Sequence, residues 1–150
     1  MNKIAVTIAA AAALLATGVY AGEMASTAEA KAMSERAQAA VNSMGRDQAF
    51  AAFADPKGEF QAKDLYVFCM DLDGVMLMHA VKPQLNGKNL KSFNKYGDEL
   101  FEDMIEVAAE SGRGWVDYKW PYPGSDEIRE KSSYVMMNSA GFFCGVGAYK

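Results

Sequence analysis

The chain has 150 residues, of which 51% are hydrophobic and 23% charged, and its formal net charge is -4. This length suits one domain, and the composition is that of a globular protein rather than a disordered one. A slightly acidic chain lacks the basic surface that nucleic-acid binding requires, so we expect no nucleic-acid partner.

The first residues have the pattern of a secretory signal peptide. Lys3 gives a short positive start, the run from Ile4 to Val19 is almost wholly apolar, and Val19-Tyr20-Ala21 places small residues where a signal peptidase reads. The apolar run is shorter than the roughly 20 residues of a membrane-spanning helix. We therefore expect a signal peptide at 1–21, a single mature domain at 22–150, and a periplasmic or secreted location.

Two helices are expected next. The first runs from Glu23 to Gly45, with Ser26 or Thr27 as its N-cap. Its apolar positions recur at helical spacing and are rich in alanine, which suits close packing on a sheet. The second helix is short and covers Arg46 to Ala54.

The remaining chain predicts five strands and one helix. The strands are expected at 65–70, 75–80, 115–120, 131–137 and 142–149, and an amphipathic helix at 99–109. Asp71-Leu72-Asp73-Gly74 predicts a hairpin turn between the first two strands, because Asp-Gly takes the positive φ angles of such turns. This order of elements predicts an α+β domain with one antiparallel sheet.

Several short runs, in their order and spacing, resemble a single Cache domain. These are Asp64-Leu65-Tyr66-Val67-Phe68 with Asp71-Leu72-Asp73-Gly74, Gly87-Lys88-Asn89-Leu90, Gly114-Trp115-Val116-Asp117-Tyr118-Lys119-Trp120-Pro121, Lys131-Ser132-Ser133-Tyr134-Val135, and Gly145-Val146-Gly147-Ala148-Tyr149. The match covers about Ala28 to Lys150, nearly the whole mature chain. The resemblance implies a PAS-like five-stranded antiparallel sheet with a long N-terminal helix on one face.

The same resemblance implies a sensor domain rather than an enzyme. Cache domains are extracytoplasmic modules that bind small molecules, often short carboxylates or amino acids, between the sheet and its loops. This chain resembles the stand-alone exported members of the family. We therefore expect it to act in sensing or chemotaxis through a membrane sensor kinase or chemoreceptor, with a homodimer through the N-terminal helix as a further expectation.

Four polar or amphipathic residues are candidates for ligand contacts. Lys131 would pair with the ligand's anionic group, while His79, Tyr118 and Tyr134 would add hydrogen bonds. The alternative for Lys131 is a solvated lysine at a strand end, and for His79 a histidine that only caps a loop carbonyl. His79 is the only histidine, which argues against a zinc site, and we expect no cofactor.

Aromatic residues are candidates for the apolar wall of the pocket. Because strand residues alternate between faces, Tyr118 and Trp120 share one face with Val116, and Trp120 with Phe93 would wall the apolar part. The alternative is that these aromatics are ordinary core residues. Cys69 and Cys144 form either a disulfide or two buried free thiols, and the sequence leaves both open.

Two other functions compete with ligand sensing. Asp71 and Asp73 after an apolar strand resemble the nucleophile motif of haloacid-dehalogenase-type phosphatases, but that chemistry needs a parallel sheet and later partners that the chain does not offer. An accessory module that docks a protein without a small ligand is the second alternative. A filled interior at Trp120, Tyr134 and Phe93 would favour docking, whereas a pocket between sheet and loops would favour ligand binding.

Overall fold

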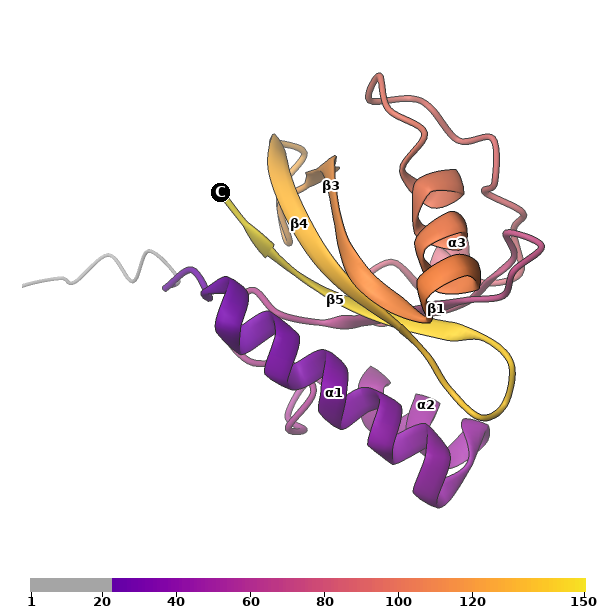
Figure 1. Ribbon diagram of the computed structural model, residues 1–150. Helices are drawn as coiled ribbons and strands as arrows, with labels where there is room; N and C mark the ends of the chain where they lie inside the picture. The colour runs from indigo at the N-terminus through magenta and orange to yellow at the C-terminus, as the bar shows by residue number, and fades with distance from the viewer. Residues whose placement is uncertain (1–22) are drawn as a thin grey trace, which may run out of the picture.

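The computed structural model describes residues 23–150, which form one five-stranded antiparallel sheet with helices on both faces (Figure 1). The strands are β1 (Val67–Met70), β2 (Met76–His79), β3 (Arg113–Pro121), β4 (Ile128–Met137) and β5 (Phe143–Tyr149), and the helices are α1 (Thr27–Met44), α2 (Arg46–Ala54) and α3 (Leu100–Ser111), with a 3₁₀ turn at Pro83–Leu85. The order across the sheet is β2-β1-β5-β4-β3. The expected α+β class, antiparallel sheet and N-terminal helix are therefore confirmed, while the expected signal peptide at 1–21 lies outside the described residues.

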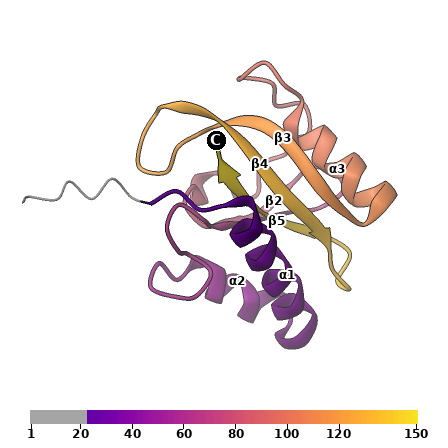
Figure 2. The same cartoon turned by 60° about the vertical axis from the view of Figure 1, so that its left-hand side comes forward.

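Helices α1 and α2 cover one face of the sheet, and α3 with the long loop before it covers the other (Figures 1 and 2). Helix α1 begins where a capping box satisfies its first amides: Ser26 Oγ accepts from the Glu29 amide, and the Glu29 carboxylate accepts from the Ser26 amide. It ends at Gly45, whose φ of 83° suits glycine. No helix in the part of the chain that the structure describes is long and apolar enough to cross a membrane.

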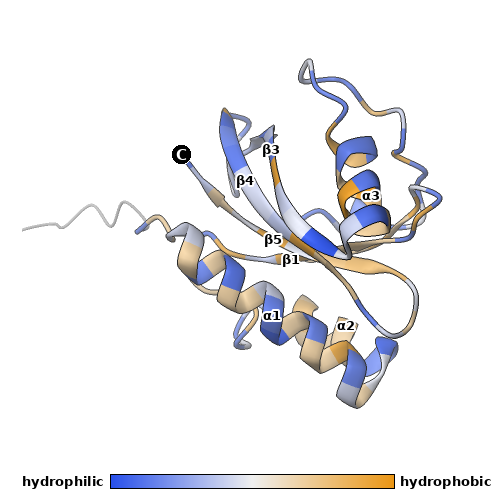
Figure 3. Cartoon of the chain, in the orientation of Figure 1, coloured by the Kyte–Doolittle hydropathy of each residue, from blue (hydrophilic) through white to orange (hydrophobic). Residues whose placement is uncertain are grey.

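The layer between α1 and the sheet is apolar and closely packed. Ala30, Met33 and Ala37 of α1 are buried against the sheet, so the alanine-rich stripe has the expected role. Figure 3 shows that β1 and β5, in the middle of the sheet, are mostly hydrophobic, whereas hydrophilic residues gather on loops and outer helix turns.

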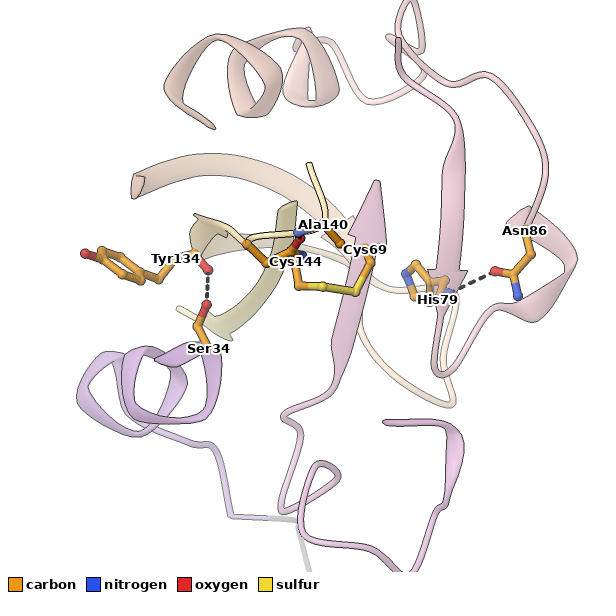
Figure 4. Close-up of a disulfide and its surroundings, with 8 residues drawn as sticks. Ser34, Cys69, His79, Asn86, Tyr134, Ala140 and Cys144 are labelled. Carbon is orange, nitrogen blue, oxygen red and sulfur yellow. Dashed lines mark hydrogen bonds between the residues drawn. A yellow bond between two sulfur atoms is a disulfide. The ribbon is translucent and has the colours of Figure 1, made fainter. Parts of the chain in front are cut away.

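A disulfide joins the two central strands in this same layer. Cys69 on β1 and Cys144 on β5 lie opposite each other in the sheet register, with their Cα atoms 4.0 Å apart (Figure 4). Both residues are buried. The structure thus has Cys69 and Cys144 as a disulfide and not as two buried free thiols.

The turn between β1 and β2 removes the phosphatase alternative. Asp71 Oδ1 accepts from the amides of Asp73 and Val75, so this carboxylate organises the turn. Gly74 has a φ of 92°, and a Cβ there would lie 2.6 Å from Cβ of Lys91. Because β1 and β2 pair antiparallel, the parallel arrangement that the phosphatase motif requires is absent here.

Candidate ligand-binding site

A small cavity lies between the sheet and α3, on the face opposite α1. Its volume is about 10 Å³. Side chains from four strands or their flanks and from α3 line it: Tyr66, Phe68, His79, Leu100, Phe101, Tyr118, Trp120 and Lys131. The lining contains two basic side chains and neither Asp nor Glu.

Lys131 is the charged group of this cavity. It was expected at the start of a strand, but β4 begins at Ile128, so Lys131 lies within the strand and is only 1% exposed. Its Nζ donates to the hydroxyl of Tyr66 at 2.9 Å and lies 4.1 Å from the centre of the Tyr66 ring and 4.8 Å from that of Tyr149. Burial lowers the pKa of Lys131 to about 7, against the opposing effect of the negative charge of Asp64. No ion pair holds Lys131 within residues 23–150.

A chain of tyrosine hydroxyls holds the ammonium in place. Tyr149 donates to the carbonyl of Pro121 at 2.7 Å, so its proton is engaged there. The 3.2 Å contact between the two hydroxyls therefore has Tyr66 as donor and Tyr149 as acceptor. Tyr66 in turn accepts from Lys131, and Tyr118 shares a 2.7 Å hydrogen bond with Ser133. The hydroxyl protons of Tyr66 and Tyr149 are consequently used within the protein, while two N–H groups of the Lys131 ammonium remain free for an occupant.

His79 adds a neutral hydrogen-bond donor. Its Nδ1 accepts from the amide of Lys82 at 3.0 Å, which leaves the ring proton on Nε2. Its own amide donates to Asn86 Oδ1 (Figure 4). Burial, together with the charges of Lys131 and Lys82, lowers the pKa of His79 to about 3, so the ring is uncharged at neutral pH.

Trp120 forms the apolar wall and carries a further unused donor. Its Nε1 is buried and has no hydrogen-bond partner among the described residues. Its ring is held by edge-to-face or tilted contacts of 5.8–5.9 Å with Phe93, Tyr96 and Phe101. Phe93 therefore supports the Trp120 ring from behind and does not itself line the cavity.

The structure brings together four of the six residues proposed from the sequence: Lys131, His79, Tyr118 and Trp120. Tyr134 is placed elsewhere, which corrects its assignment. Its ring lies 5.1 Å from that of Trp115 and 5.2 Å from Lys31 Nζ of α1, and Figure 4 shows it pointing away from His79. The physical reason is strand alternation: a residue three positions from Lys131 must face the other side of the sheet.

Two tyrosines that lie beside Lys131 were not proposed from the sequence; of these, Tyr66 lines the cavity and Tyr149 lies behind it. Tyr66 and Tyr149 were assigned to strands, but no local pattern shows that their hydroxyls meet beside Lys131. A glycine was the available signal: a Cβ at Gly147 would lie 2.5 Å from Cε of Lys131 and would also collide with Ser133. A glycine in the middle of a strand indicates close approach of a neighbour, here the lysine side chain.

An open groove adjoins the cavity. It has a volume of about 240 Å³ and shares two wall residues with the cavity, Tyr118 and Lys131. The other groove residues are Asp98, Asp117, Lys119, Glu130 and Lys150. Lys131 thus lies on the boundary between the small cavity and the larger groove. Over the described range, no cluster of His, Cys, Asp and Glu could hold a metal ion.

Comparison with protein families and curated proteins gives a consistent match. A family model described as a Cache domain matches residues 19–150. The methyl-accepting chemotaxis protein McpP of Pseudomonas putida is 33% identical over 88 residues, which is 57% of this chain and 16% of that protein. The sensor histidine kinase MctS of Rhizobium johnstonii is 32% identical over 89 residues, which is 58% of this chain and 19% of that protein. The matched part is thus less than a fifth of either relative.

Two solved structures share this fold and are described as sensor domains. One is described as the periplasmic sensor domain of a chemotaxis protein; it has a TM-score of 0.64 and 28% identity, and the match covers 81% of this chain and 88% of that one. Another comes from work on carboxylic acid recognition by a Cache chemosensory domain; it has a TM-score of 0.62 and 27% identity, and the match covers 81% and 86%.

Proposed function

The chain belongs to the Cache domain family, whose members are non-catalytic sensor domains of chemoreceptors and kinases, and from this premise we propose that it reversibly binds a short carboxylate beside Lys131. In this proposal one carboxylate oxygen accepts from the Lys131 ammonium. His79 Nε2 and Trp120 Nε1 supply further donors, and the rings of Phe101 and Trp120 cover the ligand's apolar part.

The observation that carries the proposal is a buried ammonium without a paired anion. An isolated charge in an apolar interior is strongly unfavourable unless it is paired. Among the residues that line the cavity, the free hydrogen-bonding groups are donors, namely the Lys131 N–H groups, the Trp120 indole and the outer nitrogen of His79. An occupant that satisfies them must be rich in acceptors and negative, as a carboxylate is.

The cavity also limits the ligand's size and charge. A volume of about 10 Å³ is close to that of a single water site, so even a small acid must displace wall side chains toward the adjoining groove. No carboxylate lines the cavity to meet an ammonium group, which favours a plain carboxylate over an amino acid. The relative studied for carboxylic acid recognition supports the same choice.

Location and signalling belong to the same proposal. The N-terminal signal pattern and the Cys69–Cys144 disulfide, a bond typical of oxidising compartments, both support export. Bound ligand would then be reported through a membrane chemoreceptor or sensor kinase. The docking-only alternative requires a filled interior, and a cavity of about 10 Å³ comes close to one, so the ligand screen below decides between the two.

A ligand screen tests the proposal. Acetate, propionate, butyrate, succinate and alanine are compared by thermal unfolding and calorimetry on the wild-type protein, on Lys131→Met and on Lys119→Met. Lys119 is the matched control, because it is an exposed lysine that lines only the open groove. A short monocarboxylate at about 100 times its Kd should stabilise the wild type and the control by roughly 2.7 kcal/mol and leave Lys131→Met unchanged. Absence of any stabilisation across the panel would remove the proposal.

A further inference from the structure

Lys131 combines deep burial with the lack of a counter-ion. Its side chain is 1% exposed, and within residues 23–150 no carboxylate lies within ion-pair distance of its Nζ. The rings of Tyr66 and Tyr149 lie 4.1 and 4.8 Å from Nζ, which donates to the Tyr66 hydroxyl at 2.9 Å. Such surroundings favour the neutral amine over the ammonium, because an isolated charge is costly to bury.

A neutral lysine amine is a nucleophile, because its nitrogen carries a free lone pair. Burial lowers the pKa of Lys131 to about 7, so about half of the molecules hold the free amine at neutral pH. A lysine with the ordinary pKa of about 10.4 holds it in roughly one molecule in a few thousand. Lys131 is therefore set apart from an ordinary surface lysine by its capacity to react with an electrophile.

The space beside this amine suits an electrophile of very few atoms. The cavity of about 10 Å³ is close to a single water site. Lys131 also lines the open groove, which provides a path to the amine from solvent. A Cβ at Gly147 would lie 2.5 Å from Cε of Lys131, so the lysine side chain is closely held and its nitrogen stays at the cavity. Carbon dioxide, with three atoms, requires less displacement of the walls than any organic acid.

We propose that Lys131 reacts reversibly with carbon dioxide and that the product is a lysine carbamate held in the cavity. The lone pair of Nζ attacks the carbon atom, an N–C bond forms, and the electron pair of one C–O π bond becomes the negative charge of the new carboxylate. Nζ then releases one proton to solvent. The amine and carbon dioxide thus give the carbamate and one proton, without oxidation or reduction. This reaction goes beyond the proposed function and does not depend on it.

The cavity supplies the hydrogen bonds that a carbamate needs. The carbamate keeps one N–H, which can retain the hydrogen bond to Tyr66. Its two oxygens need donors, and two unused donors line the cavity: the buried Nε1 of Trp120, which has no partner among the described residues, and Nε2 of His79. The rings that carry them lie 6.0 Å apart. The free amine uses neither donor, whereas the carbamate can use both.

Other titratable groups around Lys131 keep their charge from pH 6 to pH 8. Burial raises the pKa of Tyr66, Tyr118 and Tyr149, so all three stay protonated. His79, with a pKa of about 3, stays neutral, and helix α3 contributes apolar side chains. Asp64 favours the ammonium, and its effect is already contained in the pKa of about 7. The other charged groups line the open groove, where water screens them: Asp98, Asp117, Lys119, Glu130 and Lys150. Carbamate should therefore increase from pH 6 to pH 8 at a fixed concentration of carbon dioxide.

The first test uses carbon dioxide labelled with carbon-13 and NMR of the protein. Wild type, Lys131→Met and Lys119→Met are compared, and Lys119 is the control because it is an exposed lysine of the groove. A carbamate signal should appear in the wild type and the control, be absent from Lys131→Met, and be several times stronger at pH 8 than at pH 6. The N-terminal amine gives the same signal in all three proteins and is subtracted. Identical signals in all three would overturn the inference.

A second test locates the product in the wild-type protein and so does not depend on the folding of a variant. A trialkyloxonium salt converts the carbamate to a stable ester, and peptide mass spectrometry should place that ester on Lys131. Esters found only on the N-terminus or on exposed lysines would contradict the proposal.

The role of the indole donor is tested with a matched pair of tryptophan variants. Trp120→Phe should lower the amount of carbamate by about threefold or more, as expected for the loss of one hydrogen bond. Trp115→Phe is the control, because Trp115 is 40% exposed and does not line the cavity. An unchanged amount of carbamate in Trp120→Phe would contradict the assigned hydrogen bond.

Competition with propionate separates this inference from the proposed function. If propionate binds beside Lys131, an excess of it should suppress the carbamate, because both need the same nitrogen. Failure of propionate to bind would remove the proposed function and leave the carbamate test as it is. Absence of the carbamate would remove this inference and leave the carboxylate screen as it is.

Discussion

The two faces of the sheet bury their residues in different ways. On the α1 face the core is apolar and is tied by the Cys69–Cys144 disulfide. On the α3 face, aromatic and aliphatic side chains surround a lysine, a histidine and three tyrosine hydroxyls. Burial of the apolar layer on the α1 face stabilises the fold. Burial of charged and polar groups on the α3 face lowers stability, because charged groups resist burial. We infer that the α1 face supplies most of the stability of the fold. On the α3 face, burial of polar groups lowers stability and provides the ligand-binding site.

Removal of the disulfide should produce the largest loss of stability. The bridge closes a loop of 75 residues, for which chain-entropy estimates give about 4 kcal/mol. The double variant Cys69→Ala/Cys144→Ala should therefore unfold at much lower urea concentration than the wild type. Its folded fraction should keep the wild-type Kd for a carboxylate, because neither cysteine lines the cavity. A changed Kd in a double variant that still folds would show that the two faces of the sheet do not act independently.

Truncation of a buried side chain in α1 should also lower the free energy of unfolding, but by less than the loss of the disulfide. Met33 is 1% exposed in the α1 layer, so Met33→Ala should lower the free energy of unfolding by about 3 kcal/mol through lost burial and a new cavity. Met44, 42% exposed at the end of the same helix, provides the control, and Met44→Ala should change stability by less than about 0.5 kcal/mol. Denaturant unfolding of both variants checks the prediction.

Lys131→Met should have the opposite effect on stability while it abolishes binding. The folded pKa of about 7 lies below the ordinary value of 10.5, so the unfolded chain binds more protons between these values and the wild type gains stability as pH rises through them. The variant should therefore be more stable than the wild type by about 2 kcal/mol at pH 6, and the difference should shrink toward pH 10. A variant less stable than the wild type at pH 6 would show that Lys131 supports the fold.

The sequence predicted the α1 face better than the α3 face. Helical spacing of alanine and methionine is local, and it placed α1 to within a few residues and α2 at its observed bounds. Strand alternation also put Tyr118 and Trp120 on one buried face. The fourth strand, by contrast, is predicted to begin at Lys131, whereas β4 begins at Ile128, and so the prediction places Lys131 at a strand end.

The tyrosine chain could not be predicted for a related reason. Tyr66 and Tyr149 meet only through the pairing of β1 with β5 and of β5 with β4, and that register joins positions far apart in the sequence. Tyr134 is close to Lys131 in the sequence but faces the other side of the sheet, because it lies an odd number of positions along the same strand. To predict polar contacts across a sheet, the strand register must therefore be known. The buried face of a helix, by contrast, can be predicted from local spacing.

The smallest effect expected is at the end of the tyrosine chain. Tyr149→Phe removes the hydrogen bond to Pro121 and the acceptor for Tyr66, so the free energy of unfolding should fall by about 1 kcal/mol. Carboxylate affinity should fall by less than in Lys131→Met, because the ammonium itself remains. An equal loss of affinity in both variants would mean that the hydroxyl chain, and not the lysine charge, recognises the ligand.

Proton uptake on binding tests most directly whether a carboxylate pairs with Lys131. Calorimetry of propionate binding in two buffers of different ionisation enthalpy gives the number of protons taken up for each ligand bound. With a pKa of about 7 for the empty site, uptake should be about 0.9 proton at pH 8 and about 0.1 at pH 6. Tight binding without proton uptake at pH 8 would contradict the account, because Lys131 would then either stay neutral in the complex or already carry its proton in the empty domain.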